Sequence, residues 1–504
     1  MAARYVVGLD AGSGGCRCLI CDMRGRVVAF TSRPWSYRIP SGLEPLGREF
    51  DPQAFWSILG EAIREAVCQA GIAPTQVLAV AAASQREAVV FLDNEGKELY
   101  AGPNVDLRAL MEGLSLDEDH GDELYRITGH RPSFLFAPAK LRWFRQHRPQ
   151  DYERIARVLP LDGWIAYRLS GEAAAAISSA GEIGLLDIAQ ATWSDRLLRL
   201  LDLPPNVCPP LGQAGTTVGA VTTCAAKQTG LTPGTLVALA GADTQCGLLG
   251  MGVTDEGQGG IIAGWSATLQ IPVARPVLDG QSRTWTGCHV FPDQWVLEGN
   301  AGEAGSVYRW LKDMFFSDGP SDDYAMMEAE ADKAPLGADG ALALLGPQLM
   351  DMSNVGVKLG GFFFPVPRTV GQVGRGHLAR AFLENLAFAL RANRDRLEAI
   401  SGLTLDDFRL GGGFSRGSLF PQVLADVLNK PVKAPAFPHV SALGAAMAAA
   451  ASCAYSSLEE ACKAISPTFR TYEPRVVQAA EYQECYERWL KLAKAMDDLG
   501  QEVL

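Results

Sequence analysis

Residues 5–15 read Y-V-V-G-L-D-A-G-S-G-G, and this stretch decides the expected fold of the first half of the chain. The run from Tyr5 to Leu9 is short, β-branched and followed by glycines, which predicts a buried strand rather than a helix. Its tip presents Asp10. The small residues Gly12, Ser13 and Gly14 then let backbone N–H groups approach an anion closely. The sequence therefore predicts a carboxylate for a metal ion beside amides for phosphate.

The loop leads into a second expected strand at 16–21, and a tight turn at 22–25 leads to a third at 26–31. This is the pattern of a β-meander. No helix follows the glycines and no G-x-x-x-x-G-K-[ST] is present, which argues against a Walker-type loop and against a dinucleotide fingerprint. A plain hairpin corner has a similar sequence, so for this motif alone that alternative stays open.

A second aspartate, Asp243, sits in A-G-A-D-T-Q-C-G at 240–247 and also follows an apolar run. It lies almost half a chain from the first motif, which indicates two similar halves around a phosphate-handling cleft. The strand, glycine turn and hydroxyl residues at 259–268 repeat the first loop without its carboxylate, and Gly264 and Ser266 are its expected phosphate contacts. The glycine-rich stretch 247–260 is the expected hinge. We predict an N-terminal domain at 1–246 and a C-terminal domain at 247–504.

Composition agrees with two domains of an ordinary globular protein. A chain of 504 residues exceeds what one core usually organises, and 48% hydrophobic residues suffice for two. The net charge of −12 argues against nucleic acid or anionic membranes as partners. The eleven cysteines are odd in number and spread out, and the N-terminus carries no secretory signal, so we expect a cytoplasmic protein. Side chains alternate along a strand, so Cys16 and Cys18 lie on one face and Cys21 on the other, which disfavours a shared metal site.

A further strand, expected at 77–83, ends in S-Q-R-E at 84–87. Arg86 and Glu87 are a paired donor and acceptor, suited to gripping adjacent hydroxyls of a polyol. A surface ion pair is an equal alternative for these two residues alone. Gln85 at the same tip and Asp106, in the cluster N-V-D-L-R at 104–108, are further candidate substrate contacts.

A third glycine-rich strand tip follows a long helix expected at 376–400. The run F-R-L at 408–410 leads into G-G-G at 411–413, where Gly412 and Gly413 would let a nucleotide lie against the backbone. The helix after it can direct its N-terminal amides at phosphate, and Ser418 is a candidate contact there. A plain tight turn is an equal alternative for this motif alone.

Together these motifs resemble the FGGY family of carbohydrate kinases over nearly the whole chain. The resemblance rests on five ordered motifs: the opening around Asp10, F-A-P-A-K-L-R-W-F at 136–144, G-A-D-T-Q at 241–245, R-G-H-L-A-R-A-F-L-E at 375–384 and G-G-G-F-S-R-G-S-L-F-P-Q-V-L-A-D at 411–426. It implies an α/β fold with two actin-like, ribonuclease-H-like domains around a central cleft that binds a small-molecule sugar or polyol and Mg-ATP. It also implies Asp243 as general base, Asp10 as the residue that organises Mg²⁺, and a homodimer.

The expected substrate follows from the branch of the family. Gln85-Arg86-Glu87 is similar to the glycerol kinases and to the bacterial autoinducer kinases, which phosphorylate a dihydroxypentanedione. The segments at 104–108 and 181–187 resemble the autoinducer and xylulose-kinase branches, and Gln245 is a further candidate substrate contact. We expect a short open-chain substrate: dihydroxypentanedione-like first, a ketopentose second and glycerol third. Many relatives have Thr where this chain has Trp265, and that Thr contacts the γ-phosphate. We expect Ser266 or Thr268 to make this contact here.

Two other classes of function stay open at this point. The same fold serves heat-shock chaperones and filament proteins, which hydrolyse ATP without phosphorylating a metabolite, but the Arg86-Glu87 pair would have no use there. A degenerate kinase could bind a sugar without turning it over. Both Asp10 and Asp243 are present, which argues against that reading, while Trp265 argues for it. Sugar-dependent release of ADP separates the three classes.

Overall fold

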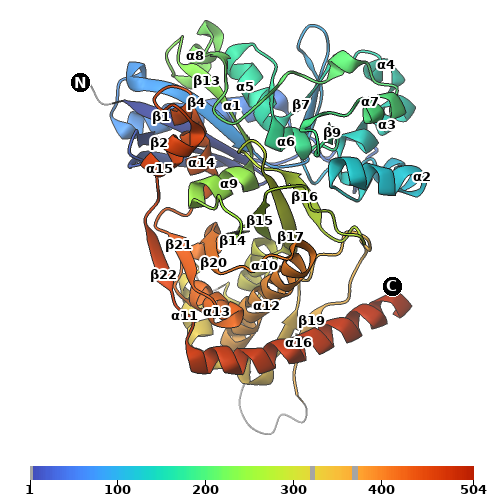
Figure 1. Cartoon of the computed structure of the whole chain (residues 1–504), viewed down its shortest axis with the longest axis vertical. Coiled ribbons are helices and arrows are strands. Elements are labelled where there is room, and N and C mark those ends of the chain that lie inside the picture. Colours follow the sequence, from blue (N-terminus) through green and yellow to red (C-terminus); the bar gives the residue numbers. More distant parts are fainter. Residues whose placement is uncertain (1–3, 318–323, 366–372, 504) are drawn as a thin grey trace. The chain divides into compact units, whose positions relative to one another are not determined.

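The computed structural model describes residues 4–317, 324–365 and 373–503 of a mixed α/β chain. Two compact units are present, and Figure 1 labels their elements. Unit 1 comprises the described residues of Met1–Thr254, Val273–Val296 and His439–Pro467. Unit 2 comprises those of Asp255–Pro272, Leu297–Pro438 and Thr468–Leu504. The units are therefore not two successive halves of the chain, because the segment around 439–467 packs with the N-terminal part.

The centre of unit 1 is a six-stranded sheet with the order β12-β13-β4-β1-β2-β3. Strands β1, β2 and β3 form an antiparallel meander, whereas β4 runs parallel to β1 and β13 parallel to β4. The strands are β1 (Tyr5–Gly12), β2 (Gly15–Asp22), β3 (Val27–Pro34), β4 (Val77–Ser84), β12 (Thr217–Ala220) and β13 (Leu236–Ala242). The carboxyl ends of β1, β4 and β13 therefore meet at one edge.

Helices cover this sheet and begin and end where the sequence provides caps. Asp51 caps α1 (Pro52–Ala70) by accepting from the backbone N–H groups of Gln53 and Ala54, and Gly71 ends it at φ 62°. Other helices of unit 1 are α2 (Leu110–Thr128), α3 (Ala137–His147), α4 (Pro149–Tyr152), α5 (Leu161–Ser170), α6 (Ile177–Gly181), α7 (Asp195–Leu200), α8 (Thr223–Thr229), α9 (Asp243–Met251), α14 (Val440–Ala451) and α15 (Leu458–Ala464). A smaller sheet has the order β6-β5-β7, from β5 (Val89–Leu92), β6 (Glu98–Gly102) and β7 (Arg157–Pro160). Two short pairs complete the strands: β8 (Ala175–Ala176) with β11 (Leu211–Gly212), and β9 (Leu186–Asp187) with β10 (Thr192–Trp193).

Helix α14 packs closely against α9 and β1, and glycines make this approach possible. An added Cβ at Gly444 would overlap the carbonyl oxygen of Cys246, and one at Gly250 would overlap that of Val440. A Cβ at Gly8 would overlap the carbonyl oxygen of Ala442. Backbone therefore lies against backbone at three points, which fixes α9 on the sheet.

Unit 2 repeats the strand order of unit 1. Its strands belong to a sheet with the order β16-β17-β15-β14-β20-β21-β22, whose edge strand β16 (Trp285–Cys288) lies in the segment Val273–Val296 of unit 1. In this sheet β14-β15 is an antiparallel hairpin, β20 runs parallel to β14 and β21 parallel to β20. The strands that lie wholly or mostly in unit 2 are β14 (Gln258–Ala263), β15 (Ser266–Val273), β17 (Trp295–Glu303), β18 (Leu342–Leu344), β19 (Gly361–Phe363), β20 (Asp407–Gly411), β21 (Val432–Pro435) and β22 (Phe469–Tyr472). The order β3-β2-β1-β4-β13-β12 of unit 1 thus corresponds to β17-β15-β14-β20-β21-β22, as two related halves predict.

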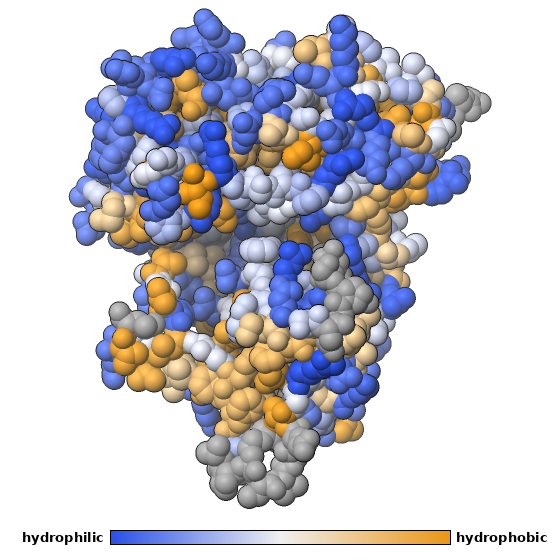
Figure 2. All heavy atoms as spheres, turned by 180° about the vertical axis from the view of Figure 1, so that it is seen from behind, coloured by the Kyte–Doolittle hydropathy of each residue, from blue (hydrophilic) through white to orange (hydrophobic). Residues whose placement is uncertain are grey.

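The helices of unit 2 are α10 (Gly305–Phe315), α11 (Ala325–Lys333), α12 (Arg375–Ser401), α13 (Leu419–Leu428) and α16 (Val476–Val503). Polar side chains dominate much of the surface in Figure 2, with apolar areas between them. Exposed apolar side chains of unit 2 include Trp310 and Met314 of α10. None of the helices in the described ranges has the length and apolar composition of a membrane span.

Most elements expected from the sequence are present, but the expected hinge differs. Residues 247–251 of the glycine-rich stretch belong to α9 and are buried, because α14 covers them. Only the segment from Gly252, which ends α9 at φ 72°, to the start of β14 is irregular, and the units divide within it, at 254/255. The stretch 124–201 contains short strands between its helices.

Candidate active site

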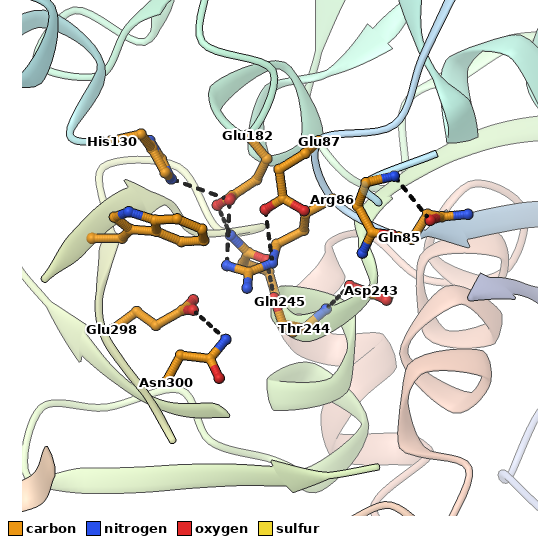
Figure 3. A network of polar contacts seen from close by, with 12 residues as sticks. Gln85, Arg86, Glu87, His130, Glu182, Asp243, Thr244, Gln245, Glu298 and Asn300 are labelled. Atoms are coloured by element: carbon orange, nitrogen blue, oxygen red, sulfur yellow. Dashed lines mark hydrogen bonds and ion pairs between the residues drawn. The ribbon is translucent and has the colours of Figure 1, made fainter. Parts of the chain in front are cut away.

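The candidate catalytic residues follow three neighbouring parallel strands. In the sheet register Ala11 lies opposite Ser84, and Ser84 lies opposite Ala242. Asp10 at the end of β1, the tip 85–87 after β4 and Asp243 after β13 are therefore brought to the same sheet edge, although the sequence separates them widely. Figure 3 shows Arg86 and Glu87, from the tip after β4, directed toward one another, and Asp243 at the start of the neighbouring helix.

Asp243 is the first residue of α9, and its Oδ1 accepts from the backbone N–H of Thr244 at 2.8 Å. Its side chain is half-buried. Surrounding protein removes water from the carboxyl group, and this burial, with the nearby charge of Asp10, raises the pKa of Asp243 from 3.8 to about 8. Such a carboxyl group takes up and releases a proton close to neutral pH, as a general base must.

Asp10 is buried and forms an ion pair that the sequence analysis missed. Its Oδ2 accepts from Nη1 of Arg17 at 2.8 Å. The two residues are direct partners in the β1-β2 hairpin register, so the position of the glycine turn between them contained the signal. The pair holds the carboxylate in one orientation at the strand end.

The loop of Gly12, Ser13 and Gly14 is held from outside by aromatic side chains. Nε1 of Trp35 donates to the carbonyl oxygen of Gly12 at 3.1 Å, and the hydroxyl of Tyr37 donates to that of Ser13 at 2.5 Å. A Cβ at Gly14 would meet nothing within 4 Å, so space lies beside this backbone. The predicted phosphate loop is thus ordered and open at Gly14.

The strand tip after β4 contains a strained residue. Glu87 has φ 59°, a left-handed conformation that non-glycine residues adopt rarely. Lys140, fully buried, donates to the carbonyl oxygen of Glu87 at 3.4 Å and to that of Leu135 at 2.6 Å. Burial lowers the pKa of Lys140 to about 8. The lysine of the 136–144 motif therefore supports the backbone of the strand tip from behind.

Arg86 belongs to a buried network that includes two residues absent from the sequence prediction, Glu182 and His130. Oε2 of Glu182 lies 3.4 Å from Nη1 of Arg86 and 3.2 Å from Nε2 of His130, and Oε1 accepts from Nε2 of Gln245 at 2.6 Å (Figure 3). The guanidinium of Arg86 also lies over the ring of Trp285, 5.4 Å from its centre. Gln245, predicted to contact substrate, is thus fully buried and bound to Glu182.

Two other predicted substrate residues are held within the protein. Gln85 is buried and hydrogen-bonds to the hydroxyl of Tyr37. Asp106 has no exposed surface, and its carboxylate accepts from Nε of Arg108 at 2.7 Å, from the backbone N–H of Arg48 and from Tyr100. These contacts engage the carboxylate of Asp106 and stabilise the turn that leads to α2, and its substrate role stays a prediction.

The predicted nucleotide residues lie in unit 2, and the structure separates them. Gly264 and Gly413 line a cavity of about 260 Å³ with an aromatic wall of Tyr308, Tyr324, Phe414 and Phe420. Gly412, at φ 87°, instead packs against the carbonyl oxygen of Ala263. Ser266 opens β15, and the exposed Ser418 borders a different cavity, of about 460 Å³.

One expectation for α13 is not met in this structure. Its first free amides were expected to face a phosphate, but Oε1 of Glu328 accepts from the backbone N–H groups of Ser418 and Leu419 at 3.1 and 3.0 Å. A carboxylate from α11 therefore caps this helix N-terminus.

Known structures with the same fold are sugar kinases. The structure of xylulose kinase from Rhodospirillum rubrum matches with a TM-score of 0.84 at 27% identity, covering 99% of this chain and 100% of that one. Plasmodium falciparum glycerol kinase with ADP matches with a TM-score of 0.82 at 19% identity, covering 97% and 98%. The fold is thus that of the sugar kinases, with two actin-like domains, which confirms the predicted fold class.

Sequence comparison identifies the family. The N-terminal domain of the FGGY family of carbohydrate kinases matches residues 5–250, and the C-terminal domain matches residues 261–453. Autoinducer-2 kinase of Salmonella paratyphi B is 31% identical over 508 aligned residues, covering 97% of this chain and 94% of that protein. The chain belongs to the FGGY family of carbohydrate kinases, and it is a phosphotransferase that uses ATP to phosphorylate a small sugar or polyol.

Proposed function

We propose that the protein transfers the γ-phosphoryl group of ATP to a hydroxyl of a short, open-chain, dihydroxypentanedione-like sugar. The observation that carries this proposal is the convergence of Asp10, Arg86 and Asp243 at the aligned ends of three parallel strands. The substrate class is supported by similarity along nearly the whole chain to proteins named autoinducer-2 kinase. Xylulose kinase, glycerol kinase and a sugar sensor without turnover are the alternatives.

In this proposal Asp243 is the catalytic base. Phosphoryl transfer requires positioning and charge neutralisation more than covalent catalysis, so one carboxylate that accepts the proton of the attacking hydroxyl is sufficient. Arg86 donates to the substrate and Glu87 accepts from it, which suits adjacent hydroxyl groups. Gln85 binds the hydroxyl of Tyr37 and Gln245 binds the carboxylate of Glu182, and in this proposal the two amides support the strand tip and α9.

Asp10 is the residue that we propose to hold Mg²⁺. In the described ranges no three His, Cys, Asp or Glu side chains gather into a metal-binding group, but Mg²⁺ commonly uses one or two carboxylates together with substrate phosphates. The charge of Asp10 raises the pKa of Asp243, so the two carboxylates repel each other and a cation would fit beside them. When bound, Mg²⁺ supplies neutralisation of the phosphate charge.

The roles of the two parts of the chain follow from the same proposal. Residues 1–246 contain the sugar-binding groups, the base and the phosphate loop of Gly12, Ser13 and Gly14. Residues 247–504 bind the nucleotide, with Gly264 and Gly413 beside its aromatic cavity and Ser266 toward phosphate. Closure around a central cleft and homodimer formation stay predictions.

The test is a coupled ADP-release assay with Mg-ATP and a panel of glycerol, xylulose, ribulose, erythritol, gluconate and dihydroxypentanedione. We expect one strong response, to dihydroxypentanedione. A strong response to xylulose or glycerol alone would replace the proposed substrate class. ADP release without any sugar would indicate an ATPase, and ATP binding without release would indicate a sensor.

Arg86→Ala should raise the KM for sugar about 10- to 100-fold, because hydrogen bonds from a charged donor contribute this much to binding. The KM for ATP should stay unchanged. The matched control is Arg168→Ala: Arg168 also lies over a tryptophan, Trp164, at 5.3 Å, and pairs with Glu98 at 3.0 Å. If Arg86→Ala raised the KM for ATP and not the KM for sugar, the proposal that this strand tip binds the sugar would be contradicted.

Gly413→Val should raise the KM for ATP about tenfold or more while thermal stability is kept. A Cβ at Gly413 would meet no atom within 4 Å, so the backbone there has room for a side chain beside the cavity that this glycine lines. Gly412→Val is the comparison, because its φ of 87° and its contact with Ala263 predict a loss of stability instead. Nucleotide titration and thermal unfolding of both variants separate the two effects. Unchanged ATP affinity in Gly413→Val would exclude this cavity as the nucleotide site.

A further inference from the structure

We propose that Glu182 is a positioning residue: with His130 it fixes the sugar-gripping Arg86 relative to the first turn of the helix that carries Asp243. The proposal rests on the functions proposed above for Arg86 and Asp243. It adds a determinant of sugar affinity that does not itself touch the sugar.

The carboxylate of Glu182 connects two elements of the site. Arg86 follows β4, and Gln245 is the third residue of α9, two positions after Asp243. Glu182 accepts from both, at 3.4 Å from Nη1 of Arg86 and 2.6 Å from Nε2 of Gln245. It is 1% exposed, and a Cβ at Gly287 would lie 2.5 Å from its Oε1. The side chain is thus enclosed, and its role must act through these partners.

His130 completes this arrangement as a cation. Its Nδ1 lies 2.6 Å from the carbonyl oxygen of Thr128, which can only accept, so Nδ1 carries a proton. Its Nε2 faces the carboxylate of Glu182 at 3.2 Å and must donate as well. An imidazole with both nitrogens protonated is positively charged. Glu182 therefore lies between two cations, Arg86 and His130.

The electrostatics agree with this geometry. Burial alone would raise the pKa of Glu182, but the charges of His130 and Arg86 outweigh it and lower the pKa to about 2. Burial and Arg86 lower the pKa of His130, but Glu182 and the hydrogen bond to the Thr128 carbonyl together outweigh them and raise this pKa from its usual value of 6.5. The rings of Phe136 and Trp285, which carry no charge, also lie beside the imidazole.

The network also explains why an isosteric amide is a poor substitute at position 182. All three partners direct N–H groups at this side chain: Arg86, His130 and Gln245. A carboxylate offers acceptors only, whereas a glutamine would turn its own NH₂ group toward at least one donor. The substitution Glu182→Gln therefore keeps the shape of the side chain and disturbs the position of Arg86.

The experiment is a double-mutant cycle of Glu182→Gln and Arg86→Ala, read as KM for sugar, KM for ATP and kcat. Glu182→Gln should raise the KM for sugar about 10- to 100-fold without changing that for ATP. The double variant should be no worse than Arg86→Ala alone, because Glu182 acts through Arg86. The control Glu98→Gln removes a charge from the similar pair with Arg168 and should change neither constant.

These outcomes separate failure of the inference from failure of the proposed function. If Arg86→Ala raises the KM for sugar but Glu182→Gln does not, or if the two effects multiply, the positioning role is overturned. If Arg86→Ala has no effect on sugar, the proposed function is wrong at this tip. Thermal unfolding of each variant shows whether it still folds. If Glu182→Gln does not fold, His130→Gln tests the same positioning role.

A pH profile distinguishes positioning from a purely structural role. Sugar affinity is measured by tryptophan fluorescence without nucleotide, in an Asp243→Asn background that removes one other group titrating near neutrality. Lys140, which supports the backbone of Glu87 and has a pKa of about 8, is present in every variant, so its contribution cancels in the comparison with His130→Gln. Affinity should fall as pH rises through the raised pKa of His130, because neutral His130 cannot donate to both Thr128 and Glu182. His130→Gln should flatten the profile. A fall of the same size in His130→Gln would overturn the proposal.

Discussion

Asp243→Asn should lower kcat by about 10² to 10⁴, the usual contribution of a general base, while ATP and sugar still bind. The amide keeps the size of the side chain and can still accept from the backbone N–H of Thr244, so the start of α9 keeps its geometry. It cannot take the proton of the attacking hydroxyl. For the wild-type protein, kcat/KM should correspondingly fall as pH decreases below about 8, because Asp243 then becomes protonated.

The same substitution should stabilise the protein at alkaline pH. The pKa of Asp243 is raised from 3.8 to about 8 in the folded state, so the folded protein keeps a proton that the unfolded chain loses near pH 4. The free energy of unfolding of the wild type therefore decreases between about pH 4 and 8 through this group and stays lowered above 8. Asp243→Asn has no such titrating group and does not lose this stability. The melting temperature of the variant minus that of the wild type should therefore increase from pH 4 to pH 8.

Single-turnover kinetics and thermal unfolding at pH 5 and 8.5 test both effects in one variant. Asp93→Asn is the control of opposite sign, because hydrogen bonds from the backbone of Lys97 and from Arg154 lower the pKa of Asp93. That variant should be less stable at neutral pH and should approach the wild type as pH falls below 4. Near-normal kcat in Asp243→Asn would mean that another group accepts the proton.

The sequence predicts those parts of the fold whose signals are local. The strand of residues 5–9 and the long helix near 376–400 were predicted from local patterns, and the structure confirms both. The hinge at 247–260 was placed by glycine content alone. Gly250 is buried in α9 because α14 approaches it closely, and such packing between residues almost 200 positions apart leaves no local signal.

The candidate site divides in the same way. Asp10, Arg86 and Asp243 could be found because each follows an apolar run that ends at a sheet edge, and Arg17 could have been found from hairpin register. Glu182 could not, because its partners Arg86 and Gln245 come from elements about 96 and 63 positions away. The role of Asp106 could not be decided from the sequence, because a polar cluster after a strand has the same pattern whether its carboxylate faces a ligand or Arg108.

Gly444→Ala should lower both stability and turnover, although alanine favours a helix over glycine by about 1 kcal/mol. The added methyl group would overlap the carbonyl oxygen of Cys246, which is backbone and cannot rotate away. Overpacking of this kind costs about 1 to 3 kcal/mol, so the propensity gain is offset or exceeded.

Turnover should fall because the displaced backbone belongs to α9. Cys246 lies one turn after Asp243, so a shift there moves the base, and small misplacements can lower kcat about 100-fold. The matched control is Gly121→Ala in α2, where the new Cβ would meet only the flexible end of Arg131, at 2.8 Å. The control should keep its kcat and melting temperature. If Gly444→Ala behaves like it, the close approach of α14 does not determine where α9 holds Asp243.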